Sequence, residues 1–475
     1  MPRVAPPTTL HLPKQDLRTA ETVAARLVRM IGAGRLAPGD RLPSTRALAQ
    51  ASGVPRSRIV AAYELLGAGG FVRIKAGSGA VVAADAAAAE SAAGAPRRST
   101  GTSTVKRTAA GGQRPRFNLM PGAPDTSLID RRDWRRAWRV ASREVPEVDR
   151  YRPNEHPELV TALRHHLRQV RGVVADEADI VVFPGVTAAL TAVLDAMAGA
   201  MPLTRAAMED PGYSWARAPL QDSGVDLELI EVDDQGLRVE LLRPTHQLVY
   251  VTPAHQYPLG ARMPVGRRHD LLQWAREHQA IVIEDDFDGE FRHDAAPLGP
   301  LRAMTGADES VVYIGTASKT LTPQLRLAWA VLPPQLSAAV RDAARRRRSD
   351  SCGVTARALA SFIESGAMAR HLARTQRTYA ARRRRLVAAL EEQLPQLRIS
   401  GADSGMHLAA RWNDGPVDTD VVAGLGRRGL MTSALSTYGI RHRPNGLLLG
   451  YAQLPETAAA AAVGEISRVL GQSGG

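Results

Sequence analysis

Residues 311–329 of the chain, VVYIGTASKTLTPQLRLAW, indicate both the fold of its larger part and the chemistry carried there. The stretch begins as a short apolar run and then passes into hydroxyl-bearing residues around Lys319. Short apolar runs that end in functional groups are typical of buried parallel strands. Residues 247–251 (QLVYV) and 280–287 (AIVIEDDF) are runs of the same kind, and helical sequence such as residues 265–279 lies between them. This alternation predicts an α/β layered domain.

Lysine is rare in this chain, which makes Lys319 unusual. Of the 61 basic residues, the lysines are Lys14, Lys75, Lys106 and Lys319, so the other 57 are arginines. A lysine amine can lose its proton and attack an aldehyde to form a Schiff base, whereas arginine stays charged. Lys319 therefore indicates an aldehyde cofactor, and the alternative is a surface lysine that escaped the bias. Its neighbours decide between the two.

The residues around Lys319 match the requirements of a pyridoxal 5'-phosphate (PLP) site. Such a site needs a carboxylate for the pyridine nitrogen, and cations or helix-terminal amides for the phosphate. Asp285 ends a predicted strand, Arg326 follows the lysine, and Thr316 and Ser318 add hydroxyl groups. In residues 184–190 (PGVTAAL) a strand turns into a helix, so free backbone amides are expected there. The residues of this turn that we expect at the phosphate are Gly185, Val186 and Thr187.

The net charge of +13 is concentrated near the N-terminus. Residues 1–83 hold twelve lysines and arginines against four acids, a net charge of +8, and residues 84–116 add +4. A small basic head on a nearly neutral body indicates a polyanion partner for the head. Residues 84–116 are rich in Ala, Gly, Ser and Thr, so we expect a flexible linker between a head at 1–83 and a body at 117–475.

Composition excludes several classes of protein. No apolar run of the 475 residues is long enough to span a bilayer, and the first fifteen lack the apolar core of a signal peptide, so we expect a cytoplasmic protein without membrane association. A single cysteine, Cys352, excludes an intramolecular disulfide and a multi-cysteine metal site. We predict no metal site and assign Cys352 no role.

The head is predicted to contain three helices and a hairpin. Apolar residues recur at helical spacing from Leu17 to Ile31, and Ser44 or Thr45 is expected to cap a second, short helix. A third helix from Pro55 to Leu66 has the apolar face Ile59, Ala62, Tyr63 and Leu66. This leaves Arg56, Ser57 and Arg58 exposed at its N-terminal end, where a recognition helix meets base edges. Two strands around residues 75–79 form a basic, glycine-rich wing.

Residues 34–82 (GRLAPGDRLPSTRALAQASGVPRSRIVAAYELLGAGGFVRIKAGSGAVV) resemble the winged helix-turn-helix domain of the GntR regulators. The likeness implies DNA contacts from Arg46, Arg56, Ser57, Arg58, Lys75 and Gly77, with Gly79 in the wing. Pro55 stands where the family usually has a capping serine, but proline suits a first helical turn, so the helix should persist. The alternative is that these arginines form only a solvated basic face.

The rest of the chain resembles the MocR group of GntR regulators, whose effector domain is similar to a fold-type I aminotransferase. The likeness rests on GVTAAL, MEDPGY, TPAHQYPLGARMP, IEDDFDGEFR, YIGTASKTLTPQLRLAW, SGMHLAARW and LLLGYA, in that order. It implies a mainly parallel large part at about 117–335 and a small α+β part at 336–475. It also implies an internal aldimine at Lys319, a pyridinium partner in Asp285 and a stacking ring in Tyr213. His255 and Gln256 are expected beside the ring, and Thr316, Ser318 and Arg326 at the phosphate.

Two departures from the group bear on activity. Phe287 stands where a tyrosine commonly bonds the ring hydroxyl, and losing that bond costs about 0.5 to 1.5 kcal/mol. We therefore expect cofactor binding with weakened catalysis. The usual arginine for a substrate carboxylate is absent from residues 447–451. Arg217, Arg441 and Arg443 are the candidates to replace it, because bidentate carboxylate recognition needs a guanidinium.

These features predict a PLP-dependent, DNA-binding transcriptional regulator that senses PLP, an amine or an amino acid. The likeness implies a homodimer. A working aminotransferase with a DNA-binding appendage, acting weakly or by a half-reaction, stays open, as does a body that serves only as a dimerisation scaffold. The arginine runs 345–348 and 382–385 are interpreted as solvated helix surface rather than a second DNA site. Vitamin B6 synthesis, amine or amino-acid catabolism and cell-wall amino-acid metabolism all fit as regulated processes.

Overall fold

A computed structural model describes residues 10, 17, 19–68, 71–75, 79–83, 115–143, 145, 155–200, 202–293, 298–401 and 404–472. The chain divides into two compact units, residues 1–110 and 111–475. The expected linker at 84–116 lies outside the described residues except for its last two positions.

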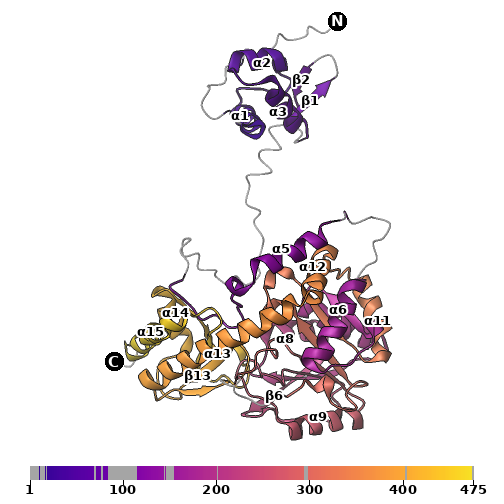
Figure 1. The fold of residues 1–475 in the computed structure, drawn as a ribbon, viewed down its shortest axis with the longest axis vertical. Helices are drawn as coiled ribbons and strands as arrows, with labels where there is room; N and C mark the ends of the chain where they lie inside the picture. Colours follow the sequence, from indigo (N-terminus) through magenta and orange to yellow (C-terminus); the bar gives the residue numbers. More distant parts are fainter. Residues whose placement is uncertain are drawn as a thin grey trace. The chain divides into compact units, whose positions relative to one another are not determined.

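The head contains the predicted helices and hairpin (Figure 1). Its elements are α1 (Ala20–Gly32), α2 (Thr45–Ser52), α3 (Arg56–Ala68), β1 (Val72–Lys75) and β2 (Gly79–Val82). Ser44 caps α2, since its Oγ accepts from the N–H of Ala47 at 3.1 Å, and Pro55 precedes α3 without preventing it. The expected apolar face of α3 is buried, and Tyr63 donates from its hydroxyl to the Pro43 carbonyl at 2.8 Å.

The body is built on an eight-stranded, mainly parallel sheet in the order β4-β11-β10-β9-β8-β5-β6-β7. Strands β10, β9, β8, β5 and β6 run parallel, while β11, β4 and β7 pair antiparallel. The strands are β4 (Ile180–Phe183), β5 (Arg205–Asp210), β6 (Asp226–Asp233), β7 (Gly236–Leu237), β8 (Leu248–Val251), β9 (Ile281–Asp285), β10 (Val311–Thr316) and β11 (Ala328–Val331). The three apolar runs of the sequence are therefore the adjacent central strands β8, β9 and β10.

Helices cover both faces of this sheet, because successive strand residues point to opposite sides. Ala330 packs with α7 and α11, whereas Trp329 and Val331 pack with α6 and α12. Helix α9 covers the β8 and β9 region. The helices of this part are α5 (Arg131–Ala141), α6 (Pro157–His166), α7 (Val186–Ala200), α8 (Ser214–Asp222), α9 (Val265–Glu277), the single turn α10 (Ala317–Thr320), α11 (Pro334–Arg346) and α12 (Gly353–Glu364).

The small part is a four-stranded antiparallel sheet in the order β12-β13-β16-β15 with helices beside it. Its elements are α13 (Ala367–Gln393), β12 (Arg398–Ser400), β13 (His407–Arg411), α14 (Asp418–Arg427), β14 (Leu430–Met431), β15 (Ser433–Ala434), β16 (Gly446–Gly450) and α15 (Ala459–Gln472). Strand β3 (Phe117–Asn118), at the start of the body, pairs in parallel with β14 near its end. Among the described residues, none of the helices meets the length and apolarity needed to cross a membrane.

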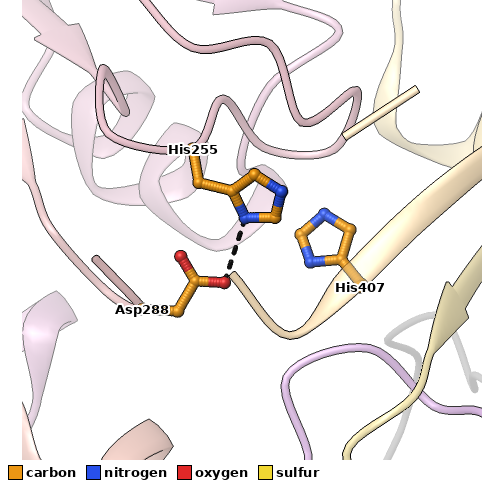
Figure 2. A group of neighbouring side chains, drawn as sticks. All are labelled: His255, Asp288 and His407. Carbon is orange, nitrogen blue, oxygen red and sulfur yellow. Dashed lines mark hydrogen bonds and ion pairs between the residues drawn. The ribbon is translucent and has the colours of Figure 1, made fainter. Parts of the chain in front are cut away.

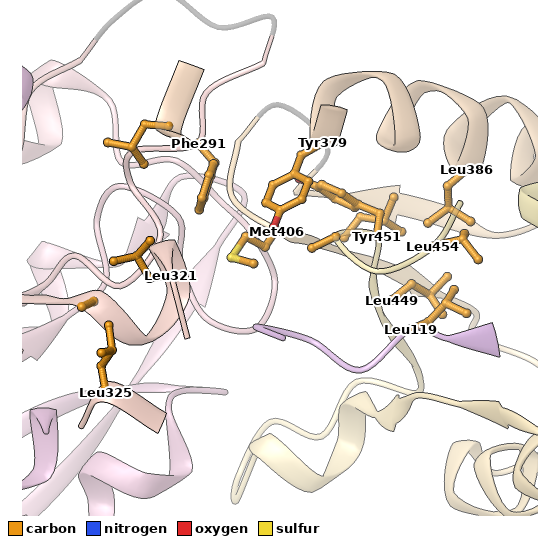
Figure 3. Packing of buried hydrophobic residues seen from close by; sticks show 14 of the residues in the cluster. Leu119, Phe291, Leu321, Leu325, Tyr379, Leu386, Met406, Leu449, Tyr451 and Leu454 are labelled. Atoms are coloured by element: carbon orange, nitrogen blue, oxygen red, sulfur yellow. The ribbon is translucent and has the colours of Figure 1, made fainter. Parts of the chain in front are cut away.

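The large and small parts share one apolar core, seen close by in Figure 3. Leu321 and Leu325 lie on the large-part side, Leu449 and Leu454 on the small-part side, with Met406 between them. Helix α11 begins at Pro334 and packs against α7, and α12 packs against α5 and α6, so the packing of the large part extends through α12. The small part is thus seated on the large part through a continuous apolar contact.

Candidate cofactor-binding site

Lys319 lies on the single turn α10, directly after the end of β10. Thr316 caps the turn, because its Oγ1 accepts a hydrogen bond from the N–H of Ser318 at 3.1 Å. The Lys319 Nζ donates to the carbonyl of Gly122 at 3.0 Å. Gly122 has a φ of +65°, and a Cβ there would lie 2.6 Å from the amine. A larger residue at this position would be strained by its left-handed backbone and would displace the lysine amine.

The electrostatic surroundings of Lys319 favour a reactive amine. Burial lowers its pKa, and the carboxylates of Asp288 and Asp285 act against that shift. A buried amine loses its proton more readily than an exposed one, which is the condition for nucleophilic attack on an aldehyde.

Asp285 ends strand β9 and is buried with only one of its two oxygens paired. Its Oδ2 accepts a hydrogen bond from the hydroxyl of Tyr250 on the neighbouring strand β8, whereas its Oδ1 has no partner. Burial raises the pKa of this carboxyl to about 7, although the bond from Tyr250 acts to lower it. A cationic N–H placed at Oδ1 would satisfy the free oxygen and stabilise the carboxylate.

Lys319 and Asp285 open into one cavity of about 220 Å³. Its walls come from the loop after β3, the start of α7, the start of α8, the loop after β8, the end of β9 and the turn after β10. The lining residues are Pro121, Gly122, Gly185, Val186, Thr187, Tyr213, Tyr257, Asp285, Phe287, Thr316, Ser318, Lys319, Pro323 and Arg326.

One end of the cavity is built to receive an anion. Val186 begins helix α7, whose first backbone N–H groups are not used within the helix. Gly185, just before it, has a φ of +146°, and a Cβ there would lie 3.5 Å from the guanidinium of Arg326. The helix terminus and the guanidinium thus lie together, and Thr187 and Ser318 line the same cavity.

This donor set fits PLP. Arg326 and the start of α7 suit a phosphate, the free Asp285 Oδ1 suits a pyridinium N–H, and Lys319 suits the aldehyde. Of the residues that the sequence proposes for the cofactor site, the structure places these around one cavity: Gly185, Val186, Thr187, Tyr213, Asp285, Phe287, Thr316, Ser318, Lys319 and Arg326.

Three aromatic side chains form the remaining wall of the cavity. Tyr213 and Tyr257 meet edge to face with ring centroids 5.5 Å apart, and Tyr257 meets Phe287 in the same way at 5.6 Å. Burial raises the pKa of the Tyr213 and Tyr257 hydroxyls. Sequence reasoning missed Tyr257, and the signal that could have found it is its place in TPAHQYPLG, directly after His255 and Gln256.

His255 and Gln256, which are expected in the loop beside the ring, do not line the cavity themselves, although Tyr257 of the same loop does. His255 Nδ1 lies 3.0 Å from Asp288 Oδ2, and the His255 ring stacks on Phe287. Gln256 donates to the carbonyls of Pro211 and Tyr257 at 2.9 and 2.8 Å. Both side chains make contacts that stabilise the loop. Tyr257 of the same loop lines the cavity instead.

The three arginines proposed for an effector carboxylate do not line the cavity either. Arg217 donates to the Tyr438 carbonyl at 3.0 Å, and burial lowers its pKa. Arg441 and Arg443 are exposed on the following loop. Within the described lining, Arg326 supplies the guanidinium, at the end suited to a phosphate.

Not all of the residues predicted to contact DNA are exposed and without other contacts. Arg46, Arg56 and Ser57 are exposed, but Arg58 is half-buried and donates from Nη1 to the Leu17 carbonyl at 3.0 Å. Arg58, on α3, therefore also holds Leu17 in place. Lys75 ends β1, paired with Gly79, and Gly77 lies outside the described residues.

Comparison with known proteins assigns both units. Residues 19–82 match the family described as bacterial regulatory proteins of the gntR family, and residues 121–445 match aminotransferase class I and II. The chain is 33% identical over 463 residues to the pyridoxine biosynthesis transcriptional regulator PdxR of Corynebacterium glutamicum, covering 96% of each chain. It is also 33% identical to the probable rhizopine catabolism regulatory protein MocR of Rhizobium meliloti, over 90% of this chain and 88% of that one. The chain belongs to the MocR group of GntR-family regulators.

Solved structures support the fold of this MocR-type body. An archaeal alanine:glyoxylate aminotransferase superposes with a TM-score of 0.69 at 21% identity, over 76% of this chain and 92% of that one. A multiple substrate aminotransferase from Thermococcus profundus gives a TM-score of 0.67 at 21% identity, over 75% and 91% of the two chains. The MocR-type regulator thus carries an aminotransferase fold of a class that typically binds PLP.

Proposed function

We propose that this regulator senses PLP through a covalent bond between Lys319 and the aldehyde of the cofactor, and that the bound state alters operator binding by the head. The observation that carries the proposal is that Lys319, Asp285 and Arg326 line one cavity, each suited to a different group of the cofactor. When bound, the cofactor would supply an electrophilic carbon and a cationic ring as electron sink. Asp285 would hold the ring proton, and Arg326 with the start of α7 would hold the phosphate.

The cofactor itself is the better candidate for the sensed molecule than an amino acid. An amino-acid effector needs a cation for its carboxylate in addition to the phosphate group's cation. Arg326 is the guanidinium among the described residues of the cavity wall, and Arg217, Arg441 and Arg443 are turned to other contacts or to solvent. The relative from Corynebacterium glutamicum is named as a regulator of pyridoxine biosynthesis, which agrees with this choice.

Absorbance of the purified full chain with added PLP tests the proposal. We expect a visible band that borohydride removes and that is absent in Lys319→Ala. Mass spectrometry of the reduced protein should find the cofactor on the peptide that holds Lys319. The absence of band and adduct in the wild type would refute covalent sensing.

A working aminotransferase is the second candidate, favoured by the retained lysine and aspartate at the cavity. Phe287 argues against it, because a phenylalanine in the wall cannot donate to the ring hydroxyl. Loss of one such bond is worth about 0.5 to 1.5 kcal/mol, roughly a 2- to 10-fold effect. Steady amino-group transfer from an amino acid to a keto acid by the wild type would favour the enzyme. We expect at most a slow half-reaction, faster in Phe287→Tyr.

The proposed regulator acts as a homodimer on operator DNA in the cytoplasm. Aminotransferase-like sites are usually completed by a second subunit, and paired heads would read paired half-sites. Binding of the cofactor shifts the small part relative to the large part, and the heads follow through the linker at 84–116. Sedimentation of the full chain with and without PLP gives the oligomeric state.

A further inference from the structure

A second cavity, of about 320 Å³, lies between the large and small parts of the body. The large part contributes residues 233–234 at the end of β6 and residues 259–262 after β8. The small part contributes residues 398–401, Ser404 and Arg411. None of these residues lines the cavity of Lys319, so the cofactor contacts proposed there do not account for this second cavity.

Positive charge exceeds negative charge in the lining of the second cavity. Its arginines are Arg262, Arg398 and Arg411, and its carboxylates are Asp233 and Asp234. Asp233 is already paired, because Arg267, outside the lining, donates to its Oδ2 at 2.9 Å and also bonds its Oδ1. Of the described lining residues, Asp234 is therefore the carboxylate that remains to face three guanidinium groups.

Two of these guanidinium groups are neighbours on one face of the small sheet. Arg398 and Arg411 are direct cross-strand partners in the antiparallel pair of β12 and β13, so their side chains project from the same face. Like charges in this position destabilise a sheet unless an anion compensates them. This pair of arginines therefore calls for a negative charge in the cavity.

Asp234 supplies that charge only in part. Its Oδ2 lies 3.1 Å from Arg398 Nη2, and its Oδ1 lies 3.8 Å from Arg411 Nη2. The Asp234 side chain is 75% exposed, so water weakens both attractions. Arg411 Nε is buried without a partner, and burial together with repulsion from Arg398 lowers the pKa of Arg411. A ligand with two negative charges would satisfy this guanidinium group better than the exposed Asp234 does.

The large and small parts touch directly at this cavity. Ser400 Oγ, on β12, donates to the Leu259 carbonyl at 2.9 Å. Gly260 and Gly401 have φ values of +74° and +76°, and a Cβ on Gly260 would lie 2.2 Å from the Gly401 Cα. A ligand that bonds Arg262 and Arg411 here would join the two parts where their backbones already meet.

A buried layer separates the second cavity from the first, and its side chains are His255, Asp288 and His407 (Figure 2). The His255 ring stacks on Phe287, which lines the first cavity, at 6.1 Å between centroids. On the other side, a Cβ on Gly260 would lie 2.9 Å from His255 Nε2. Asp288 Oδ2 fixes the ring, 3.0 Å from His255 Nδ1, and accepts from the Met406 N–H at 3.1 Å. The second cavity is thus a site of its own.

We propose that the second cavity binds a small dianion, a dicarboxylate or a phosphate-bearing molecule, between Arg262 of the large part and Arg398 and Arg411 of the small part. Guanidinium groups recognise both kinds of anion through paired N–H donors. Asp234 competes with the ligand for Arg398 and Arg411. Because the ligand contacts both parts, it favours the arrangement in which they are docked. The site goes beyond the proposed function and does not require that Lys319 binds PLP.

Calorimetric titration of the PLP-free full chain with malonate and with inorganic phosphate, at an ionic strength held constant with sodium chloride, tests the proposal. We expect saturable binding of at least one anion, and the tighter of the two identifies the kind of ligand. Hydrogen exchange should show protection in residues 259–262 and 398–411. Protection at the start of α7 instead would mean that the anion occupies the cavity of Lys319.

Arg411→Gln should weaken binding about 10- to 100-fold, because it removes charge-assisted hydrogen bonds to the ligand. Arg428→Gln is the matched control, since Arg428 is an arginine of the small part that bonds Glu465 and does not line the cavity. Its affinity for the anion should equal that of the wild type.

Changing the acids gives the opposite sign, which damage to the fold cannot produce. Asp234→Asn should tighten binding by up to about 5-fold, since it removes the competitor in an exposed ion pair. Asp226→Asn, on the same strand β6, is the control, because Asp226 is equally exposed and lies 3.6 Å from Arg205 outside the cavity. Arg267→Gln should weaken binding, because it leaves Asp233 unpaired.

The absence of saturable binding of either anion would overturn the proposal, as would protection confined to the start of α7. Equal weakening in Arg411→Gln and Arg428→Gln, or weaker binding in Asp234→Asn, would also overturn it. If Arg411→Gln does not fold, Asp234→Asn and Arg267→Gln decide by their opposite signs. Because no PLP is present, failure here is distinct from failure of the absorbance experiment.

Discussion

At the scale of single residues, the buried Asp285 carboxyl has one oxygen without a partner, which lowers the stability of the folded chain while no ligand is bound. The carboxyl is buried, Tyr250 bonds one oxygen, and the other oxygen has no partner. Burial of a carboxylate is unfavourable unless a cation or donors compensate it. A pyridinium N–H would supply that compensation, so the cofactor should stabilise the body more than an equally bulky neutral molecule would.

Replacing Asp285 with asparagine should separate stability from binding. The pKa of Asp285 is raised from 3.8 to about 7 in the folded chain, so between these values the folded state keeps a proton that the unfolded state has released. The stability due to this proton is present at low pH and is lost as the pH rises toward 7. In the PLP-free chain, the melting temperature of Asp285→Asn should therefore rise relative to that of the wild type across this window, then level off.

The same variant should bind PLP about 10- to 100-fold more weakly, since a hydrogen bond to a charged group contributes about 1.5 to 3 kcal/mol. Melting curves at several pH values and absorbance titrations measure the two effects. Parallel pH profiles for wild type and variant would contradict the stability argument.

At the scale of elements, helix α3 presents its polar N-terminal end while its other face closes the head core. Ile59 and Ala62 are fully buried, and Arg56 and Ser57 are exposed one turn earlier. Arg58 lies at the same polar end, but it also donates a hydrogen bond to the Leu17 carbonyl and so contributes to the fold of the head. Arg56 is therefore the cleaner probe of base recognition.

Arg56→Ala should weaken operator binding by about 1 to 3 kcal/mol and relax preference at one base position. Arg35→Ala, which removes the same charge from an exposed loop, should weaken binding to all sequences equally. Fluorescence anisotropy with operator and scrambled duplexes distinguishes them. Unchanged operator affinity in Arg56→Ala would contradict the recognition-helix assignment.

The segment before β13 is the element that joins the large and small parts of the body at the site. Gly405→Ala would put a Cβ into His255 and force a left-handed conformation on alanine, which alone costs about 1 to 3 kcal/mol. We expect a lower free energy of unfolding and a displaced Met406 N–H. Gly426→Ala, in helix α14 with no atom near its Cβ, should instead be neutral or stabilise by up to about 1 kcal/mol.

Denaturant unfolding of the two glycine variants checks this pair. Equal losses for Gly405→Ala and Gly426→Ala would show that the close approach to His255 is unimportant.

At the scale of the whole molecule, the basic head and the aminotransferase-like body belong to one chain but form separate compact units. The head carries +8 of the net +13, so electrostatic attraction to DNA resides mainly there. The body contributes the cavity that Lys319, Asp285 and Arg326 line. Lys319, which would bind the ligand, lies in the body, whereas DNA binding resides in the head. A signal from the ligand must therefore be transmitted from the body to the head in the assembled full-length protein.

Lys319→Ala in the full chain should keep operator affinity and lose its response to PLP. Footprints of wild type and variant with and without PLP measure this. A response that persists in Lys319→Ala would favour reversible binding or a body that serves only as a dimerisation scaffold.

The sequence by itself determined the three helices and the hairpin of the head, the three central strands of the body, and the placement of Asp285 and Lys319 at strand ends. These follow from local periodicity and from the rule that parallel strands share a carboxyl edge. Tertiary structure decided that Tyr257 rather than His255 or Gln256 faces the cavity, and that Arg217 bonds Tyr438 instead. It also decided that Asp288 meets Met406 and that β3 pairs with β14. Such contacts join residues more than a hundred positions apart, and the packing of the small part on the large part sets them, which local patterns do not encode.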